Sequence, residues 1–251
     1  MRLPTVWIFD LGSGSSMRLA GPGAINDRPE WTADGRVLFR SNARSLNGLW
    51  LQALDGSPAQ PFFKVPAANV DEGVLSRDGR YLVYQRDSIG NGEVWFRALQ
   101  GDSTPVRVEP RAELGAYGAR PSPDGKWLAY ASNPTGAVQV YLRSFPSLSA
   151  SLQATYDGGF TPVWSPDGTR LYYVNGAQLW MARIGSTQPF SIASRSLVLD
   201  RGYTFNNVHA DYDVGPNGMV VALRSPSLDQ QVVVVRNLGT ELRARLKGAA
   251  R

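Results

Sequence analysis

The stretch TPVWSPDGTRLYYVNG, residues 161–176, decides the fold of this chain. Two runs rich in Val, Trp, Tyr and Leu, which are typical of β-strands, flank the turn sequence SPDG. Pro166 presets φ for the first central position of a turn, Asp167 can hydrogen-bond its own backbone, and Gly168 takes the left-handed position without steric cost. The stretch therefore predicts a β-hairpin, with Asp167 as a turn residue and not a working carboxylate.

The same hairpin recurs at intervals of 43 to 50 residues. Its Asp-Gly or Asn-Gly pair falls at Asp34-Gly35, Asp78-Gly79, Asp124-Gly125, Asp167-Gly168 and Asn217-Gly218. Between successive hairpins lie two further short runs with the alternation of strands, such as LWLQAL (49–54) followed by PFFKV (61–65). Four short strands in a repeat of about 45 residues indicate the blades of a β-propeller.

The whole pattern predicts an all-β propeller of four-stranded antiparallel blades, with five to six blades represented. Complete blades are expected at 27–64, 71–109, 118–157 and 161–200. Residues 5–20 hold only a third and a fourth strand, and residues 211–237 hold a first, second and third. We assign residues 1–237 to one domain that starts in mid-blade. Either VWIFDL (6–11) closes a five-bladed ring imperfectly, or a hairpin is missing upstream, and we favour part of a longer propeller. The tail, 238–251, predicts a short amphipathic helix.

The tryptophans support this register, because all seven fall in repeat columns: Trp7, Trp31, Trp50, Trp95, Trp127, Trp164 and Trp180. Such columns are where one blade packs on the next, so we expect the rings to fill that space. The alternative is that some of them stack on carbohydrate.

Composition restricts the chemistry. The chain has no cysteine and one histidine, His209, which excludes thiolate chemistry and a histidine-rich metal site. Most of the net charge of +5 lies in the tail, so no face has the basic patch of a nucleic-acid binder. No apolar run approaches the roughly eighteen residues of a membrane helix. We expect no cofactor, no metal, no nucleic-acid partner and no membrane insertion.

Catalytic motifs are also missing from the sequence. There is no G-x-S-x-G, and His209 is the single histidine that could act as the base of a hydrolase triad. In HADYD, His209, Asp211 and Asp213 alternate along one strand and could share a cation, although a polar strand edge is the simpler interpretation. We expect this chain to have no enzymatic activity of its own.

A candidate binding site comes from the segments that lead into the first strand of each blade. Six residues before each turn Asp or Asn stand Arg28, Glu72, Gly118, Thr161 and Asp211. Equivalent steps lie on one ring about a propeller axis, so these segments should surround one end of the central channel. They differ between blades, as the loops of a specific site do, but unconstrained loops would differ too. We predict a channel-mouth site for a protein or small polar ligand, formed by Arg28, Glu72, Tyr117, Arg120, Phe160, His209 and Asp211.

The segments TPVWSPDGTRLYYVNG, ARPSPDGKWLAYASN and NDRPEWTADGRVLFRS resemble the repeats of TolB-like β-propellers. The order of segments over 5–246 is also similar to the C-terminal region of large bacterial serine/threonine protein kinases, for example in VWIFDLGSGSSMRLA and ADYDVGPNG. In that family a kinase domain and a membrane helix precede a propeller assumed to be extracytoplasmic, so the resemblance implies a periplasmic location. The chain has no glycine-rich nucleotide loop, H-R-D or D-F-G, so kinase activity does not carry over. The second blade departs from the repeat, since LSRDG lacks both the Trp and the Pro.

The leading interpretation is a non-catalytic binding or sensing module, the recognition region of a larger bacterial signalling protein. One alternative is the substrate-gating propeller of a serine peptidase related to prolyl oligopeptidase, with its catalytic domain outside this chain. Another is a TolB-type scaffold for envelope proteins.

Overall fold

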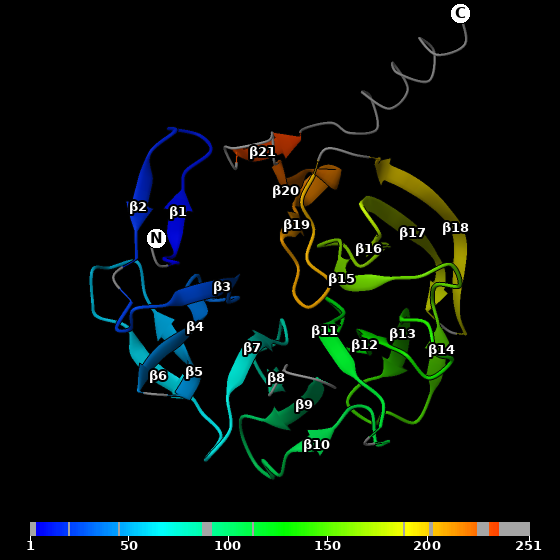
Figure 1. Ribbon diagram of the computed structural model, residues 1–251, viewed down its shortest axis with the longest axis horizontal. Helices are drawn as coiled ribbons and strands as arrows, with labels where there is room; N and C mark the ends of the chain where they lie inside the picture. The colour runs from blue at the N-terminus through cyan, green and yellow to red at the C-terminus, as the bar shows by residue number, and fades with distance from the viewer. Residues whose placement is uncertain are drawn as a thin grey trace, which may run out of the picture. The chain divides into compact units, whose positions relative to one another are not determined.

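The computed structural model describes residues 4–19, 21–44, 46–86, 92–111, 113–187, 189–200, 203–224 and 231–235. Within this part of the chain the strands form six antiparallel sheets, and the one helical element is a 3-10 turn, Pro216–Gly218 (Figure 1). The fold is all-β, as predicted. The predicted helix at 238–251 lies outside the described residues. No described helix is long and apolar enough to cross a membrane.

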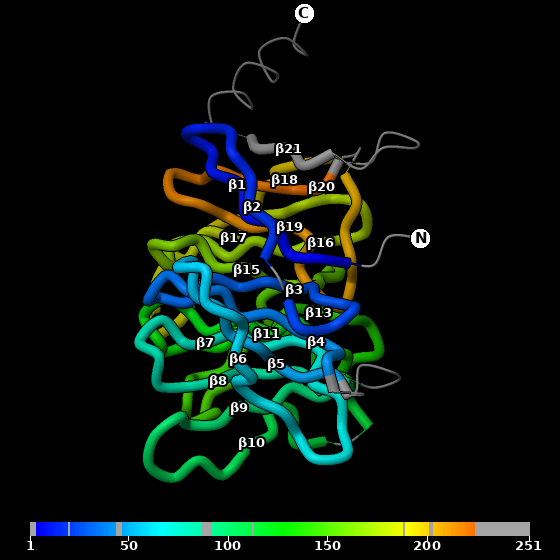
Figure 2. The backbone as a smooth tube through the Cα atoms, turned by 90° about the vertical axis from the view of Figure 1, so that its left-hand side faces the viewer, coloured from blue at the N-terminus to red at the C-terminus, as the bar shows by residue number. Residues whose placement is uncertain are grey.

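The chain divides into two compact units between Gly115 and Ala116. The first unit holds one two-stranded and two four-stranded sheets. Its strands are β1 (Trp7–Phe9) and β2 (Ser16–Arg18); β3 (Asn26–Trp31), β4 (Val37–Arg44), β5 (Leu46–Gln52) and β6 (Gln60–Phe63); and β7 (Val70–Leu75), β8 (Tyr81–Arg86), β9 (Glu93–Ala98) and β10 (Val106–Arg107). Figure 2 shows β7 to β10 lying one beside the next in chain order.

The second unit holds two four-stranded sheets and one of three strands. Its strands are β11 (Ala116–Pro121), β12 (Trp127–Ser132), β13 (Gln139–Ser144) and β14 (Ser151–Gln153); β15 (Phe160–Trp164), β16 (Arg170–Asn175), β17 (Gln178–Thr187) and β18 (Phe190–Leu199); and β19 (Tyr212–Val214), β20 (Val220–Arg224) and β21 (Gln231–Val235). The four complete blades begin and end within a few residues of the predicted limits, so that prediction is confirmed.

The turns between the first two strands have one geometry in all four complete blades. A Ser or Thr hydroxyl two residues before the Asp donates to its carboxylate, at Thr32–Asp34 (2.5 Å), Ser76–Asp78 (2.6 Å), Ser122–Asp124 (2.6 Å) and Ser165–Asp167 (2.6 Å). The glycine amide then donates back to the carbonyl of that Ser or Thr, over 2.8 to 3.0 Å. Each of these glycines has a positive φ, between 69° and 80°. The repeat motif is therefore S/T-x-D-G, two residues longer than the Asp-Gly pair read from the sequence.

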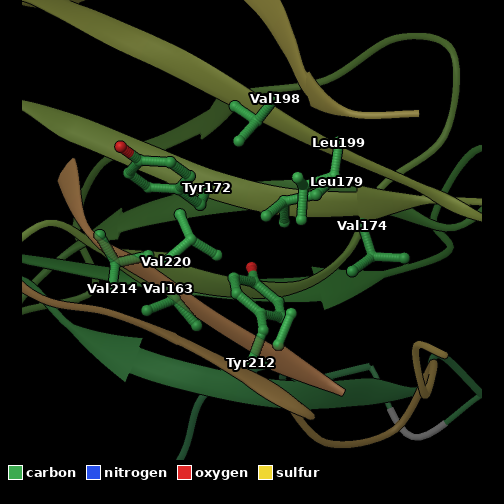
Figure 3. Packing of buried hydrophobic residues seen from close by; sticks show 10 residues of the cluster. Val163, Tyr172, Val174, Leu179, Val198, Leu199, Tyr212, Val214 and Val220 are labelled. Atoms are coloured by element: carbon green, nitrogen blue, oxygen red, sulfur yellow. The ribbon is translucent and has the colours of Figure 1, made fainter. Parts of the chain in front are cut away.

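Blades pack through the first strand of the following sheet. In the first unit β7 lies on β4 and β5, where Val70 joins a core with Leu38 and Leu49. In the second unit β15 contacts β11, β12 and β13, and β19 contacts β15. Figure 3 shows the resulting core, in which Val163 of β15 and Tyr212 of β19 pack against Tyr172 and Val174 of β16.

The tryptophans follow the prediction in part. Trp50 and Trp164 are 8% exposed and pack between sheets, and Trp95, Trp127 and Trp180 are half-buried. Trp7 and Trp31 are instead 50% and 58% exposed, so for these two the prediction is wrong. The repeat position of Trp31 is occupied in the fourth blade by Trp164, which is covered from the preceding sheet. The sheet before β3 has only two described strands, with no counterpart of β12.

Candidate functional site

The first strand of each complete blade breaks its regular pairing at one place. The register shifts between Asp27 and Glu30 in β3, between Val70 and Glu72 in β7, between Tyr117 and Arg120 in β11, and between Phe160 and Val163 in β15. These β-bulges fall at the step that the sequence assigned to the channel mouth. Bulges re-aim side chains and are frequent beside functional sites.

In three of the bulges one residue has a left-handed backbone: Arg28 (φ 52°), Gly118 (φ 56°) and Thr161 (φ 45°). These are the residues six positions before the turn Asp of their blades. Glycine takes this conformation freely, but for Arg or Thr it costs roughly 1–2 kcal/mol. Strain of this kind, repeated at one step on non-glycine residues, is typical of sites where the backbone serves binding.

In the first unit, Asp71 organises a charged network around its bulge. The Arg28 Nη1 donates to the backbone O of Asp71 over 2.7 Å, which links β3 to β7. The Asp71 carboxylate Oδ1 accepts from Arg40 Nη1 at 3.3 Å and from Asn47 Nδ2 at 3.1 Å. Arg40 also forms a two-pronged ion pair with Asp27. The result is a set of opposite charges held in fixed positions.

This network is largely buried. Asp71 is 6% and Glu72 is 4% exposed. Burial lowers the pKa of Arg28, and the nearby Arg40 charge lowers it further, while the charge of Glu72 opposes the shift. The Arg28 Nε is buried and makes no hydrogen bond within the described residues. A charged side chain held with an unused donor is suited to recognising an anionic or polar group.

In the second unit, three of the predicted segments meet at Gly118. A Cβ added there would lie 3.3 Å from the Cα of Thr161 and 3.6 Å from the carbonyl O of Val208. The bulges of β11 and β15 and the segment leading into β19 are therefore in backbone contact. This brings the segments of Tyr117, Arg120, Phe160, His209 and Asp211 together.

Hydrogen bonds fix these segments in place. The buried Tyr212 hydroxyl donates to the backbone O of Thr161 over 2.7 Å, and the Trp164 Nε1 donates to the backbone O of Arg120 over 3.1 Å. Burial raises the pKa of Tyr212 well above its usual value, so the hydroxyl stays a donor. Thr161 is 1% exposed, and its Oγ1 makes no hydrogen bond within the described residues.

The individual predicted residues differ in their surroundings. Arg120 is 9% exposed and its Nη1 donates to the backbone O of Ala119 over 3.1 Å. Phe160 packs against the core between β15 and β19, and Tyr117 is half-buried. The His209 Nε2 lies 3.0 Å from Asp211 Oδ1, a direct pairing within HADYD. Among the described residues, no three His, Asp or Glu side chains are grouped closely enough to hold a metal ion.

The structure thus places Arg28 near Glu72 in the first unit, and the other five predicted residues on three contacting segments in the second. That all seven surround the mouth of one channel stays a prediction. Sequence reasoning missed Arg40, Asn47 and Tyr212. Arg40 could have been found, because it stands opposite Asp27 in the antiparallel pairing of β3 with β4.

Comparisons with solved structures support the propeller fold. TolB from Acinetobacter baumannii superposes with a TM-score of 0.74 at 19% identity, over 94% of this chain and 57% of that one. A TolB-type protein from Agrobacterium tumefaciens gives 0.71 at 21% identity, over 94% and 85%. A puromycin-hydrolyzing peptidase from Mycobacterium tuberculosis gives 0.59 at 15% identity, over 90% and 39%. No family model and no curated protein matches the sequence. The chain has the β-propeller fold shared by TolB-like proteins, and it spans just over half of the Acinetobacter TolB.

Proposed function

We propose that this chain is a non-catalytic binding module that recognises a charged or zwitterionic group on the bulged first strands of its blades. The observation that carries the proposal is the left-handed backbone at Arg28 and Thr161, beside buried Asp71, Glu72 and Arg120. Strained backbone and buried charge both lower stability, and a binding role accounts for their presence.

We also propose the kind of larger protein in which this module acts. The sequence resemblance to bacterial kinase propellers supports a recognition region in a signalling protein, located outside the cytoplasm. A second candidate is the propeller of a peptidase, favoured by the likeness to the puromycin-hydrolyzing enzyme. The coding sequence on either side separates them, since a kinase domain upstream supports the first and a hydrolase domain downstream supports the second.

Binding is tested by scanning fluorimetry of the purified chain with a panel of free amino acids and dipeptides. We expect at least one member to raise the Tm of the wild type, and the rise to be lost in Glu72→Gln and Arg120→Gln. Arg36→Gln, which alters an exposed turn residue, is the matched control and should keep the full rise. The proposal fails if no member stabilises the chain, or if the control loses the response as the site variants do.

A further inference from the structure

In the second unit, the hairpin β17–β18 distinguishes the fourth blade from the third. These strands have ten residues each, against six in β13 and three in β14 of the preceding blade (Figure 1). The additional length ends in the pair Thr187↔Phe190. It is tied to the turn of its own blade by Ile184, whose amide donates to the Thr169 carbonyl over 2.9 Å.

The hairpin carries Phe190 onto two tryptophans. The Phe190 ring centroid lies 4.9 Å from that of Trp127 on β12 and 6.5 Å from that of Trp164 on β15, the latter edge to face. The three rings line a cavity of 420 Å³ that reaches the turns of the third and fourth blades. Its lining includes Asp124 and Asp167, with hydroxyls from Ser122, Thr169, Ser186 and Thr187. This volume is within the range of small-ligand sites.

The two carboxylates differ from their counterparts in the first two blades. There, the residue two positions after the Asp is an arginine, and ion pairs join Arg36 to Asp34 at 2.6 Å and Arg80 to Asp78 at 2.5 Å. In each case the arginine binds the Oδ2 of the carboxylate. The Asp Oδ1 is occupied by the turn itself.

In the third and fourth blades the corresponding residues are Lys126 and Thr169. No described cation forms an ion pair with Asp124 or Asp167, and their Oδ2 atoms accept no hydrogen bond from the described residues. Hydrogen bonds from Ser165 and from the Thr169 amide lower the pKa of Asp167 to about 2, so it is ionised at neutral pH. Arg170 contributes to that shift, but its Nη1 is near Gly218, 3.5 Å from where a Cβ would be.

We propose that this cavity binds an organic cation, a guanidinium or ammonium group, which supplies the charge that Arg36 and Arg80 supply in the first two blades. The Oδ2 atoms of Asp124 and Asp167 accept its N–H groups, and Trp127 and Phe190 provide aromatic faces for cation–π contact. The cation is either a free small molecule or a side chain of a partner protein, and both have the same chemistry at the site.

The test is calorimetric titration of the full chain, with tryptophan fluorescence as a second readout. The probes are agmatine for a free cation, the tripeptide Ac-Gly-Arg-Gly-amide for a protein side chain, and the uncharged citrulline tripeptide as the control. If both cations bind, the cavity recognises the cationic group whichever molecule carries it. If only the tripeptide binds, the ligand is a side chain of a partner protein. We expect the citrulline tripeptide not to bind.

The repeat supplies matched variants. Asp124→Asn and Asp167→Asn should each weaken cation binding at least fivefold, whereas Asp34→Asn and Asp78→Asn, which alter the same turn elsewhere, should leave it unchanged. Thr169→Arg should abolish binding by placing an internal guanidinium beside Asp167. Equal weakening by all four Asn variants, equal binding of the citrulline tripeptide, or no binding of either cation would overturn the proposal.

Discussion

The two ends of each first strand are built by opposite rules. At the turn end, Thr32, Ser76, Ser122 and Ser165 make one hydrogen bond to the following Asp in all four complete blades. At the bulge end the backbone deviation recurs, but the residues change from Arg28 to Gly118 to Thr161. Uniform chemistry at a repeated position serves the fold, which every blade shares. Varied side chains on a repeated backbone serve recognition, because each blade then presents a different group.

Gly118→Val should have the largest effect on stability. A valine here would be forced into the left-handed backbone conformation at φ 56°, and its Cβ would lie 3.3 Å from the Cα of Thr161. Strain and crowding together predict a loss of roughly 3–5 kcal/mol in the free energy of unfolding, measured by urea denaturation. A loss below that of the turn variant Gly168→Val would show that the bulges are not in close contact.

Asp71→Asn should come next, because it removes a buried charge that Arg40 and Asn47 both contact. We expect a loss of about 3 kcal/mol in the free energy of unfolding. The control is Asp78→Asn, whose ion pair with Arg80 is exposed and predicts a change below about 1 kcal/mol. Similar losses of unfolding free energy in both variants would show that the buried network of Asp71 contributes no more to stability than the exposed turn of Asp78.

Gly168→Val tests the turn by strain alone, since the nearest atom to its Cβ would be a Pro123 carbon at an ordinary 3.7 Å. The φ of 69° predicts a loss of roughly 1–3 kcal/mol in urea unfolding. Ligand response in the fluorimetric panel should survive. A lost response in a folded Gly168→Val chain would assign recognition of the panel ligand to this turn and not to the bulges.

Ser165→Ala should have the smallest effect, about 1 kcal/mol, although its hydroxyl donates to Asp167 and accepts from the Arg170 amide, because both of these bonds lie at a turn whose carboxylate is exposed. The same change should raise the pKa of Asp167 from about 2 toward 3.8, as followed by NMR titration of its carboxyl carbon. Since the folded-state pKa is depressed, the stability gained from ionised Asp167 is present above pH 3.8 and disappears as pH falls toward 2. An unchanged pKa in the variant would contradict the role of the Ser165 hydroxyl.

Sequence patterns predicted the blades because the turn is local. Asp and Gly at fixed spacing select the turn, and the turn sets the register of the strands on both sides. The step of the bulges was also predictable by counting back from the turn. Their conformation was not, because nothing local in Arg28 or Thr161 favours a positive φ.

Features that depend on contacts between sheets could not be predicted. Trp31 and Trp164 stand at the same repeat step, yet one is exposed and the other covered, because coverage depends on the preceding sheet. The sequence assigned Asp167 to the turn alone, and the turn bonds confirm that role. Asp167 lies beside a cavity because the long hairpin β17–β18 brings Phe190 to the same place. The repeat pattern of the sequence does not indicate the length of that hairpin.

Hydrogen–deuterium exchange of the full chain tests the central claim most directly, with and without the panel member that raises the Tm most. The account predicts slower exchange at the bulged first strands, in peptides covering 26–31, 70–75, 116–121 and 160–164. Exchange at the turns 32–36 and 76–80 should not change. Protection confined to the turns, or spread evenly over both ends of the first strands, would contradict the assignment of recognition to the bulges.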